Sequence, residues 1–270
     1  MSEEKVVLGL VGSPNPEGRT NRLVSAALEG AEASGATVEK IQMSDHVVDA
    51  CKDCLPWVCL SNLKCTYEDP SFELLSDKIL NCGALVFGTP VYWWDVSGLV
   101  KYLILKMFRV FAMSGPLHGL PALGIGIAGG TGNGLISGLK PLYHFFQIMQ
   151  MRALDPVAAT RFDFDESLDK SRMLGEKIGG MAKERHPFDS YGERLLWYDN
   201  MPYINDNLTT ERSYLAALMD RAVPAEQRSE VKGSLATAEA LNRSGKPVAA
   251  QAEISRLYGS TARILKDMNQ

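Results

Sequence analysis

The chain has 270 residues, of which 46% are hydrophobic and 22% are charged, and its formal net charge is -4. This acidic balance argues against nucleic acid as a main partner. No apolar run approaches the roughly 20 residues that span a bilayer. The first residues, MSEEKVV, are acidic and lead directly into an apolar run, unlike a secretory signal. We therefore expect a globular cytoplasmic protein that binds neither nucleic acid nor a membrane.

Up to about residue 185 the chain alternates between apolar runs and amphipathic segments. The segments at 6–11, 37–43, 83–87, 121–128 and 152–159 predict strands, and those at 20–34, 71–80, 97–111, 135–149 and 165–185 predict helices. Apolar strands that alternate with amphipathic helices are typical of a parallel sheet covered on both faces. The sequence therefore predicts a doubly wound α/β fold.

The alternation of apolar and amphipathic segments ends at His186-Pro187. A connector rich in Tyr and Trp, residues 191–207, precedes three expected helices at 209–223, 224–243 and 247–268, and no strand signal follows Ala159. We therefore divide the chain into a first unit, residues 1–187, and an all-helical C-terminal extension, residues 188–270. The extension has no internal repeat and no motif with recognisable chemistry, so we interpret it as structural, packed on the first unit or on a partner subunit.

The first apolar run, Val6 to Val11, breaks into a polar loop that ends at a helix start. The loop offers hydroxyl groups, side-chain amides and one arginine, together with backbone N–H groups at the start of the helix. An anion bound there gains the helix dipole and the free N–H donors, so the loop predicts a terminal phosphate site. A P-loop needs four residues between its glycines and then Lys, whereas five separate Gly12 from Gly18 and Arg19 follows. A turn without any ligand is the alternative.

Two later strand ends carry unusual loops, and ligands of open α/β sheets bind at the carboxyl ends of the strands. The loop at 88–94, GTPVYWW, presents three large aromatic side chains that suit a flat apolar ligand or a protein interface, unless they cover a neighbouring helix. The glycines of 129–134 let the backbone approach a planar ring. The GxGxxG formed by Gly124, Gly126 and Gly129 is no dinucleotide turn, because its first two glycines lie inside a strand.

A loop that binds a phosphate, a loop with large aromatic side chains and a glycine-rich loop together describe a site for flavin mononucleotide (FMN). The segments GSPNPEGRTN, GTPVYWWDVSGLVKYLILK and GIAGGTGNG resemble the three FMN loops of the NAD(P)H-dependent FMN reductase group, within the flavodoxin-like superfamily. The resemblance covers about residues 5–185 and implies five parallel strands in the order 2-1-3-4-5, in homo-dimers or homo-tetramers. It implies phosphate contacts at Ser13, Pro14, Asn15, Gly18, Arg19, Thr20 and Asn21, and ring contacts at Pro90, Val91, Tyr92, Trp93, Gly129, Gly130, Thr131, Gly132 and Gly134.

Four of the five cysteines, Cys51, Cys54, Cys59 and Cys65, lie within fifteen residues of one another. Four thiolates suit a [4Fe-4S] cluster, and they equally suit tetrahedral zinc; cysteines without a role are the third interpretation. The motif resembles that of the iron–sulfur flavoproteins, a subgroup of the same family. Their usual pattern has two residues between the second and third cysteines, whereas four stand here, at 55–58. Cys82 begins an apolar strand and is expected to be a buried small side chain.

These patterns predict an FMN-dependent oxidoreductase that carries a [4Fe-4S] cluster and draws electrons from NAD(P)H or a ferredoxin-like protein. A flavin handles two electrons together and a cluster handles one, so the pair would connect such a donor to a small-molecule acceptor. The alternatives are an NAD(P)H:quinone or FMN reductase with structural zinc, and a non-enzymatic electron carrier. No residue is assigned a catalytic role. His118, expected near the flavin loops, either contacts the ring or is merely solvated.

Overall fold

The computed structural model describes residues 6–55 and 58–268, so Lys5, Pro56 and Trp57 lie outside the described residues. The sheet is built from β1 (Val7–Val11), β2 (Val38–Gln42), β3 (Ala84–Tyr92), β5 (Pro121–Ala128), β6 (Arg152–Ala153) and β7 (Val157–Thr160). These strands are parallel in the order β2-β1-β3-β5-β6, with β7 also paired to β5. The predicted doubly wound fold and its 2-1-3-4-5 order are confirmed.

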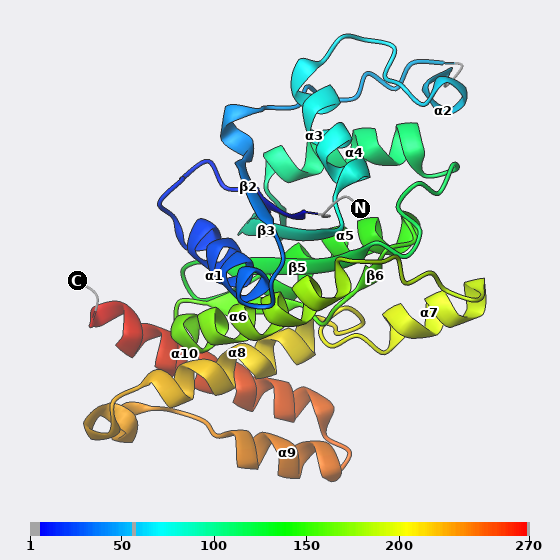
Figure 1. Cartoon of the computed structure of the whole chain (residues 1–270). Helices are drawn as coiled ribbons and strands as arrows, with labels where there is room; N and C mark the ends of the chain where they lie inside the picture. The colour runs from blue at the N-terminus through cyan, green and yellow to red at the C-terminus, as the bar shows by residue number, and fades with distance from the viewer. Residues whose placement is uncertain (1–5, 56–57, 269–270) are drawn as a thin grey trace.

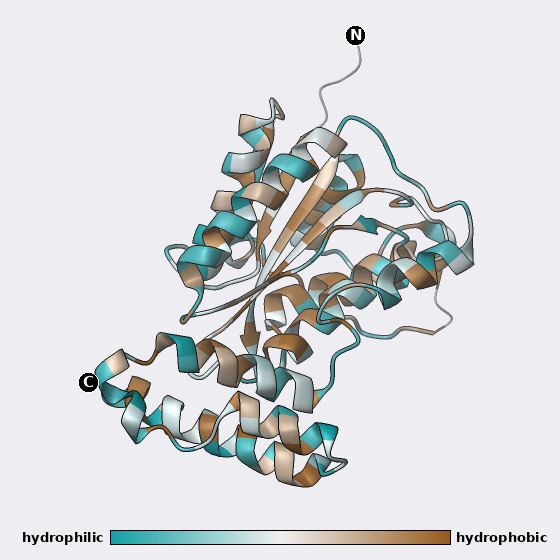
Figure 2. Ribbon diagram, turned by 90° about the horizontal axis from the view of Figure 1, so that it is seen from below, coloured by the Kyte–Doolittle hydropathy of each residue, from teal (hydrophilic) through white to brown (hydrophobic). Residues whose placement is uncertain are grey.

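Helices cover both faces of this sheet (Figure 1). One face carries α1 (Arg19–Ala33) and α6 (Phe164–Met181), and the other carries α3 (Pro70–Asn81), α4 (Gly98–Phe111) and α5 (Leu135–Ile148). Successive strand residues point to opposite faces, so Val7 and Val11 pack in one core and Leu8 and Leu10 in the other. Figure 2 shows this distribution as hydrophobic strands between helices with hydrophilic outer faces. Burial on both faces explains why β1 and β5 contain no charged residue, whereas the less buried β2 contains Glu39 and Lys40.

The fifth strand differs from the prediction because it contains a bulge. Pro121 pairs with Arg152 and Ile125 pairs with Val157, so the chain advances four residues on β5 and five on its neighbour. The extra residue falls where Pro156 interrupts the strand. Proline has no N–H to donate to the ladder, and bulges are among the few places in a sheet that tolerate it.

The cysteine segment is an excursion between β2 and α3, on the side of the molecule occupied by α3 and α4 (Figure 1). It contains the 3-10 turn η1 (Met43–Asp45) and the short helix α2 (Val58–Asn62). Both ends of the excursion are tied to the carboxylate of Asp69, which accepts the amide of Asp49 at 3.0 Å and caps α3 through the amide of Phe72 at 3.0 Å. Lys106 of α4 forms an ion pair with the same carboxylate, and both side chains are buried. One buried ion pair therefore anchors the whole segment.

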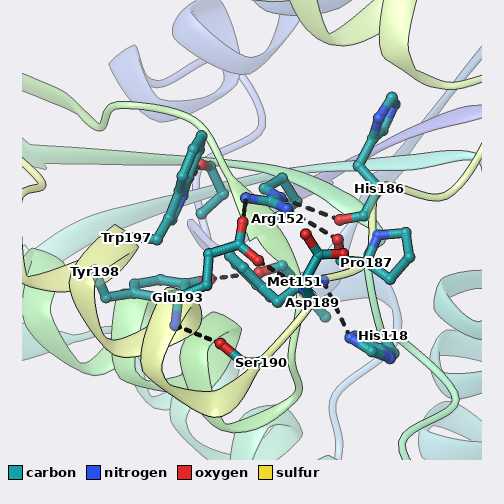
Figure 3. Close-up of polar contacts among 12 residues, drawn as sticks. His118, Met151, Arg152, His186, Pro187, Asp189, Ser190, Glu193, Trp197 and Tyr198 are labelled. Atoms are coloured by element: carbon teal, nitrogen blue, oxygen red, sulfur yellow. Dashed lines mark hydrogen bonds and ion pairs between the residues drawn. The ribbon is translucent and has the colours of Figure 1, made fainter.

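The connector after the first unit is more ordered than the sequence predicts, because it contains helix α7 (Tyr191–Asp199). Figure 3 shows Arg152 at the centre of this junction. Its guanidinium lies 3.9 Å from the centroid of the Phe188 ring and 4.6 Å from that of Trp197, and it donates to the carbonyl oxygens of His186 and Pro187 at 3.1 and 2.9 Å. An ion pair with Glu193 at 2.9 Å fixes α7 itself. The junction is held by one stacked and fully bonded arginine.

The rest of the chain forms α8 (Leu208–Ala222), the 3-10 turn η2 (Ala225–Glu230), α9 (Leu235–Arg243) and α10 (Pro247–Asp267). The single helix expected at 224–243 is wrong: the chain unwinds around Gly233, whose φ of +104° is not helical. The three α-helices share a hydrophobic cluster around Leu215, Ile254 and Leu257, and they lie together at one end of the molecule (Figure 1). Within the described chain, no helix is both long enough and apolar enough to cross a membrane.

We predict that Lys106→Met lowers the free energy of unfolding by about 3–5 kcal/mol, because the Asp69 carboxylate would be left buried without its counter-charge. Lys101 is the matched control, since it pairs with Asp95 at 2.8 Å at a half-exposed position of the same helix. Lys101→Met should cost less than about 1 kcal/mol. Urea unfolding at neutral pH measures both variants, and equal costs would contradict the anchoring role of the buried pair.

The ion pair of Asp69 and Lys106 also makes the free energy of unfolding depend on pH. Burial alone would raise the pKa of the Asp69 carboxyl, but hydrogen bonds from Lys106 and from the amides of Phe72 and Asp49 outweigh it and hold the pKa below the ordinary value of 3.8. A lowered folded-state pKa stabilises the protein fully above 3.8, and the contribution is lost as the pH falls below that value. The difference between the wild type and Lys106→Met should therefore be largest at neutral pH and shrink in acid.

Candidate functional site

The first loop leads into α1 and leaves the first backbone amides of that helix without a side-chain cap. The helix begins at Arg19, one residue earlier than expected, and its N-cap is Gly18, which has no side chain to bind the free amides of the first turn. That turn, Arg-Thr-Asn-Arg, contains no acidic residue. Ser13 and Thr20 are buried, and Asn15 turns the loop by donating its amide to the Ser13 hydroxyl at 3.2 Å. The amides, two hydroxyls and Arg19 are donors of the kind that a phosphate site requires.

The first loop touches the middle of β3, just beyond the end of β1. The Gly12 amide donates to the Gly88 carbonyl at 2.8 Å, and the Ser97 hydroxyl donates to the Gly12 carbonyl at 2.5 Å. A Cβ on Gly12 would lie 2.2 Å from Val100 Cγ2, so no larger residue fits there. Sequence reasoning missed Gln42 at the end of β2, whose side-chain amide donates to the Ser13 carbonyl. Its position as a polar residue at the end of a predicted strand was the signal in the sequence that could have identified it.

The aromatic segment is a β-hairpin, where a loop was expected. β3 continues to Tyr92, and the two-residue β4 (Asp95–Val96) returns antiparallel to it. The strand passes through Pro90 because β1 has already ended opposite Gly88, so that β3 has a strand on one side only and proline is tolerated.

Trp93 and Trp94 form the turn of this hairpin. Their φ angles of +51° and +60° match the twist of a tight hairpin but are strained for residues other than glycine. The two rings pack edge to face with centroids 5.3 Å apart, and Trp93 is 88% exposed. Such strain concentrates at functional sites, and here it leaves a bare aromatic surface beside the strand ends.

The hairpin in turn touches the glycine loop that follows β5. A Cβ on Gly134 would lie 2.9 Å from Trp94 Cδ1, and Gly134, with φ +83°, is the N-cap of α5. Among the described residues, the amides of Gly130, Thr131 and Asn133 have no hydrogen-bond partner. The structure thus brings the three predicted segments to one edge of the sheet, with unused backbone donors beside an aromatic surface. Val91 differs from its neighbours, since its side chain packs against Gly138 of α5.

A residue of the C-terminal extension also reaches this edge, which the sequence did not indicate. The Glu211 carboxylate of α8 is buried and accepts the amides of Gly134 and Ile136, each at 2.9 Å. In the sequence Glu211 is an ordinary acidic residue in a first helical turn. Its partners lie more than 70 residues away, so no local pattern could identify it.

The expected proximity of His118 to the flavin loops is wrong. His118 precedes β5, so it lies at the amino end of that strand, whereas the three loops lie at the carboxyl ends. Its Nε2 accepts the amide of Phe188 at 3.2 Å, in the junction with the connector (Figure 3). It is a structural residue of that junction.

The cysteines share one segment but do not form a closed metal site. Cys59 of α2 is buried, with its thiol 3.7 Å from the Arg109 carbonyl oxygen, and Cys54 lies 3.9 Å from the Thr66 hydroxyl. Burial raises the pKa of the Cys59 thiol, and the nearby Cys54 and Cys51 raise it further. Among residues 6–55 and 58–268, no three His, Cys, Asp or Glu side chains gather closely enough to hold a metal ion. The donor set is suited to a cluster, but its arrangement is not.

Cys82 is buried as expected, 3.2 Å from the Ile79 carbonyl oxygen.

Comparison with known proteins decides the family. The model of the family described as NADPH-dependent FMN reductase matches residues 6–164 of this chain. The chain belongs to that family. FMN reductase membership makes it an FMN-dependent oxidoreductase, and the donor set and backbone geometry of the three loops fit FMN.

Two similar proteins are iron-sulfur flavoproteins. One, from Methanocaldococcus jannaschii, is 28% identical over 194 residues, which cover 66% of this chain and 97% of that protein. Another, from Archaeoglobus fulgidus, is 26% identical over 198 residues, covering 70% and 85% of the two chains. Among solved structures, a flavone reductase superposes with a TM-score of 0.53 at 18% identity, covering 66% of this chain and 63% of that one. This structural likeness shows the fold.

We predict that Arg19→Gln weakens FMN binding by the apoprotein about tenfold or more, because a charge-assisted hydrogen bond to phosphate is lost. Arg22→Gln is the matched control: it removes the same charge one turn further along α1, from a guanidinium that lies 4.6 Å from the centroid of the Phe164 ring, where that of Arg19 lies 5.8 Å from the same ring. Quenching of flavin fluorescence on titration gives both dissociation constants. If the two variants bind FMN equally well, Arg19 is not a phosphate ligand.

Proposed function

We propose that this FMN reductase family member passes electrons from NAD(P)H or a reduced ferredoxin-like protein to a small-molecule acceptor, and that its cysteine segment carries a [4Fe-4S] cluster. The observation that carries the first part is the convergence of three loops at one sheet edge, each supplying a different requirement of FMN. FMN supplies the redox chemistry, since it accepts two electrons together and releases them singly.

The residues of the chain bind and orient this cofactor. Ser13, Thr20 and Arg19, with the amides at the start of α1, hold the phosphate. The hairpin residues Tyr92 and Trp93 cover the ring, and the free amides of the glycine loop donate to its carbonyl oxygens. The remaining contacts proposed from the sequence are Pro14, Asn15, Gly18, Asn21, Pro90, Val91, Gly129, Gly130, Thr131, Gly132 and Gly134.

Two observations support the cluster. The similar proteins from Methanocaldococcus jannaschii and Archaeoglobus fulgidus are named iron-sulfur flavoproteins. This chain also has four cysteines in one short segment, the number that a [4Fe-4S] cluster requires. Because the thiols are not gathered in the structure, binding requires the segment to rearrange around the metal. Metal binding commonly orders its own ligands in this way.

The proposed assembly is a homo-dimer or homo-tetramer. Its support is an apolar groove of about 340 Å³ between α4 and α5, lined by Leu105, Phe108 and Ile148, which are partly exposed. Large exposed apolar patches mark interaction surfaces. A second copy of the chain is the occupant that the family resemblance implies, and light scattering of the purified protein measures the assembly.

Anaerobically purified protein tests the proposal directly. We expect flavin absorption bands over a broad shoulder, with iron and acid-labile sulfide near about four each per chain. We also expect flavin reduction by NADPH, by NADH or by reduced ferredoxin. Flavin bands with zinc and no sulfide would replace the cluster by structural zinc. Reduction by ferredoxin alone, without turnover of an acceptor, would make the protein an electron carrier.

Single cysteine variants identify the ligands. Cys54→Ala should lose most of the iron and sulfide and keep FMN, because one iron loses its thiolate while the flavin loops are untouched. Cys82→Ala is the matched control, since Cys82 is buried between α3 and β3 and should retain the full iron content. Iron and sulfide assays compare the two proteins. Equal iron contents would exclude Cys54 as a ligand.

A further inference from the structure

The buried carboxylate of Glu211 connects the C-terminal extension to the glycine loop. Glu211 is 5% exposed, so its charge has lost most of its hydration. A buried carboxylate is costly unless hydrogen bonds replace the water. Both of its oxygens are bonded: Oε1 accepts the amide of Gly134 and Oε2 that of Ile136, each at 2.9 Å. The charge of α8 is thus stabilised by the loop between β5 and α5.

The glycine loop needs an external support. Gly130, Gly132 and Gly134 all have positive φ, between +55° and +83°, so the loop is built from residues with little conformational preference. Gly134 is the N-cap of α5 and has no side chain to satisfy the first amides of the helix. Glu211 supplies the missing cap from another part of the chain, and its negative charge suits the positive end of the helix dipole.

Two further residues of α8 hold the same edge. A Cβ on Gly132 would lie 2.6 Å from Leu215 Cδ2, so Leu215, one turn beyond Glu211, packs directly on the loop. The Tyr214 hydroxyl lies 3.3 Å from Oδ2 of Asp163. The other oxygen of Asp163 accepts the amide of Thr160 at 2.7 Å, at the end of β7. One face of α8 therefore fastens the ends of both β5 and β7.

The hydrogen bonds of Glu211 decide which backbone amides of the glycine loop remain available to a ligand. Glu211 occupies those of Gly134 and Ile136, whereas those of Gly130, Thr131 and Asn133 have no partner among the described residues. Glu211 fixes the end of the glycine loop at the start of α5. The preceding part of the loop is thereby held in one direction, beside the aromatic hairpin. Preorganised donors bind a ligand more tightly than donors that must be ordered on binding.

We propose that the C-terminal extension is part of the cofactor site, and that Glu211 is a positioning residue that holds residues 129–136 in the conformation that binds FMN. This inference rests on the proposed binding of FMN at the glycine loop. It gives the helical extension a function that its sequence does not suggest, since the site is incomplete without α8.

The extension contains a matched control for Glu211. The Glu253 side chain is also largely buried, and its Oε1 accepts the amide of Ser234 at 3.0 Å. Its other oxygen is bonded to Arg256 of the same helix. Among the described residues, the hydrogen bonds of the Glu253 carboxylate thus join parts of the extension to each other. Glu211→Gln and Glu253→Gln make the same chemical change, and each replaces an accepting oxygen by an NH2 group.

The full-length apoprotein is tested first by hydrogen exchange. We expect Glu211→Gln to speed the exchange of the Gly134 and Ile136 amides at least about tenfold and Glu253→Gln to leave them unchanged, because only the first variant removes an acceptor from the loop. We then expect Glu211→Gln to raise the dissociation constant for FMN about tenfold, with Glu253→Gln within twofold of the wild type. Neither measurement depends on turnover.

A smaller change covers the case in which Glu211→Gln does not fold. Leu215→Val removes one methylene where α8 packs on Gly132, and Ile254→Val removes one from the same hydrophobic cluster away from the loop. Leu215→Val should accelerate exchange at Gly132 and weaken FMN binding more than Ile254→Val. Wild-type protein that binds no FMN would overturn the proposed function. FMN binding that is equal in each variant and its control would overturn the role of the extension alone.

Discussion

The structure depends on the parallel pairing of β1, β3 and β5, because parallel strands end at the same edge of a sheet. That constraint brings together three loops that lie at residues 12–21, 88–94 and 129–134, and close contacts then connect them. Gly12 is bonded to Gly88 in the middle of β3 and to Ser97, the N-cap of α4, and Trp94 packs on Gly134. Each loop supplies one kind of group: a helix start with a cation, an aromatic surface, and bare backbone amides. No single loop would distinguish FMN from another anion or planar molecule.

Two attachments extend this framework in opposite directions. On the side of α3 and α4, the buried pair of Asp69 and Lys106 anchors the cysteine segment at both ends. At the glycine loop, Glu211 joins the helical extension to the start of α5. Both are buried carboxylates that bind backbone amides, one stabilised also by a lysine and the other by a helix dipole. The first positions a candidate metal segment and the second supports the cofactor loop.

Much of the fold could be predicted from the sequence, because buried parallel strands are apolar runs and their order follows from the family. The errors arise where tertiary contacts override local signals. Pro90 suggested the end of a strand, but β3 had already lost one neighbour and continued into a hairpin. Helix α7 owes its position to the stacking of Arg152, and the role of Glu211 depends on partners far along the chain. The sequence shows that four thiol groups are available as metal ligands. Whether these four groups come together in space depends on how the segment folds.

The roles assigned to the three loops depend most directly on where the flavin binds. The measurement that tests it is a crystal structure of the protein reconstituted with FMN. It should show the phosphate at the start of α1, between Ser13 and Arg19, and the ring between the aromatic hairpin and the glycine loop, with α8 still bonded to that loop through Glu211. A flavin bound elsewhere, or a ring that displaces Glu211 from Gly134, would contradict the account.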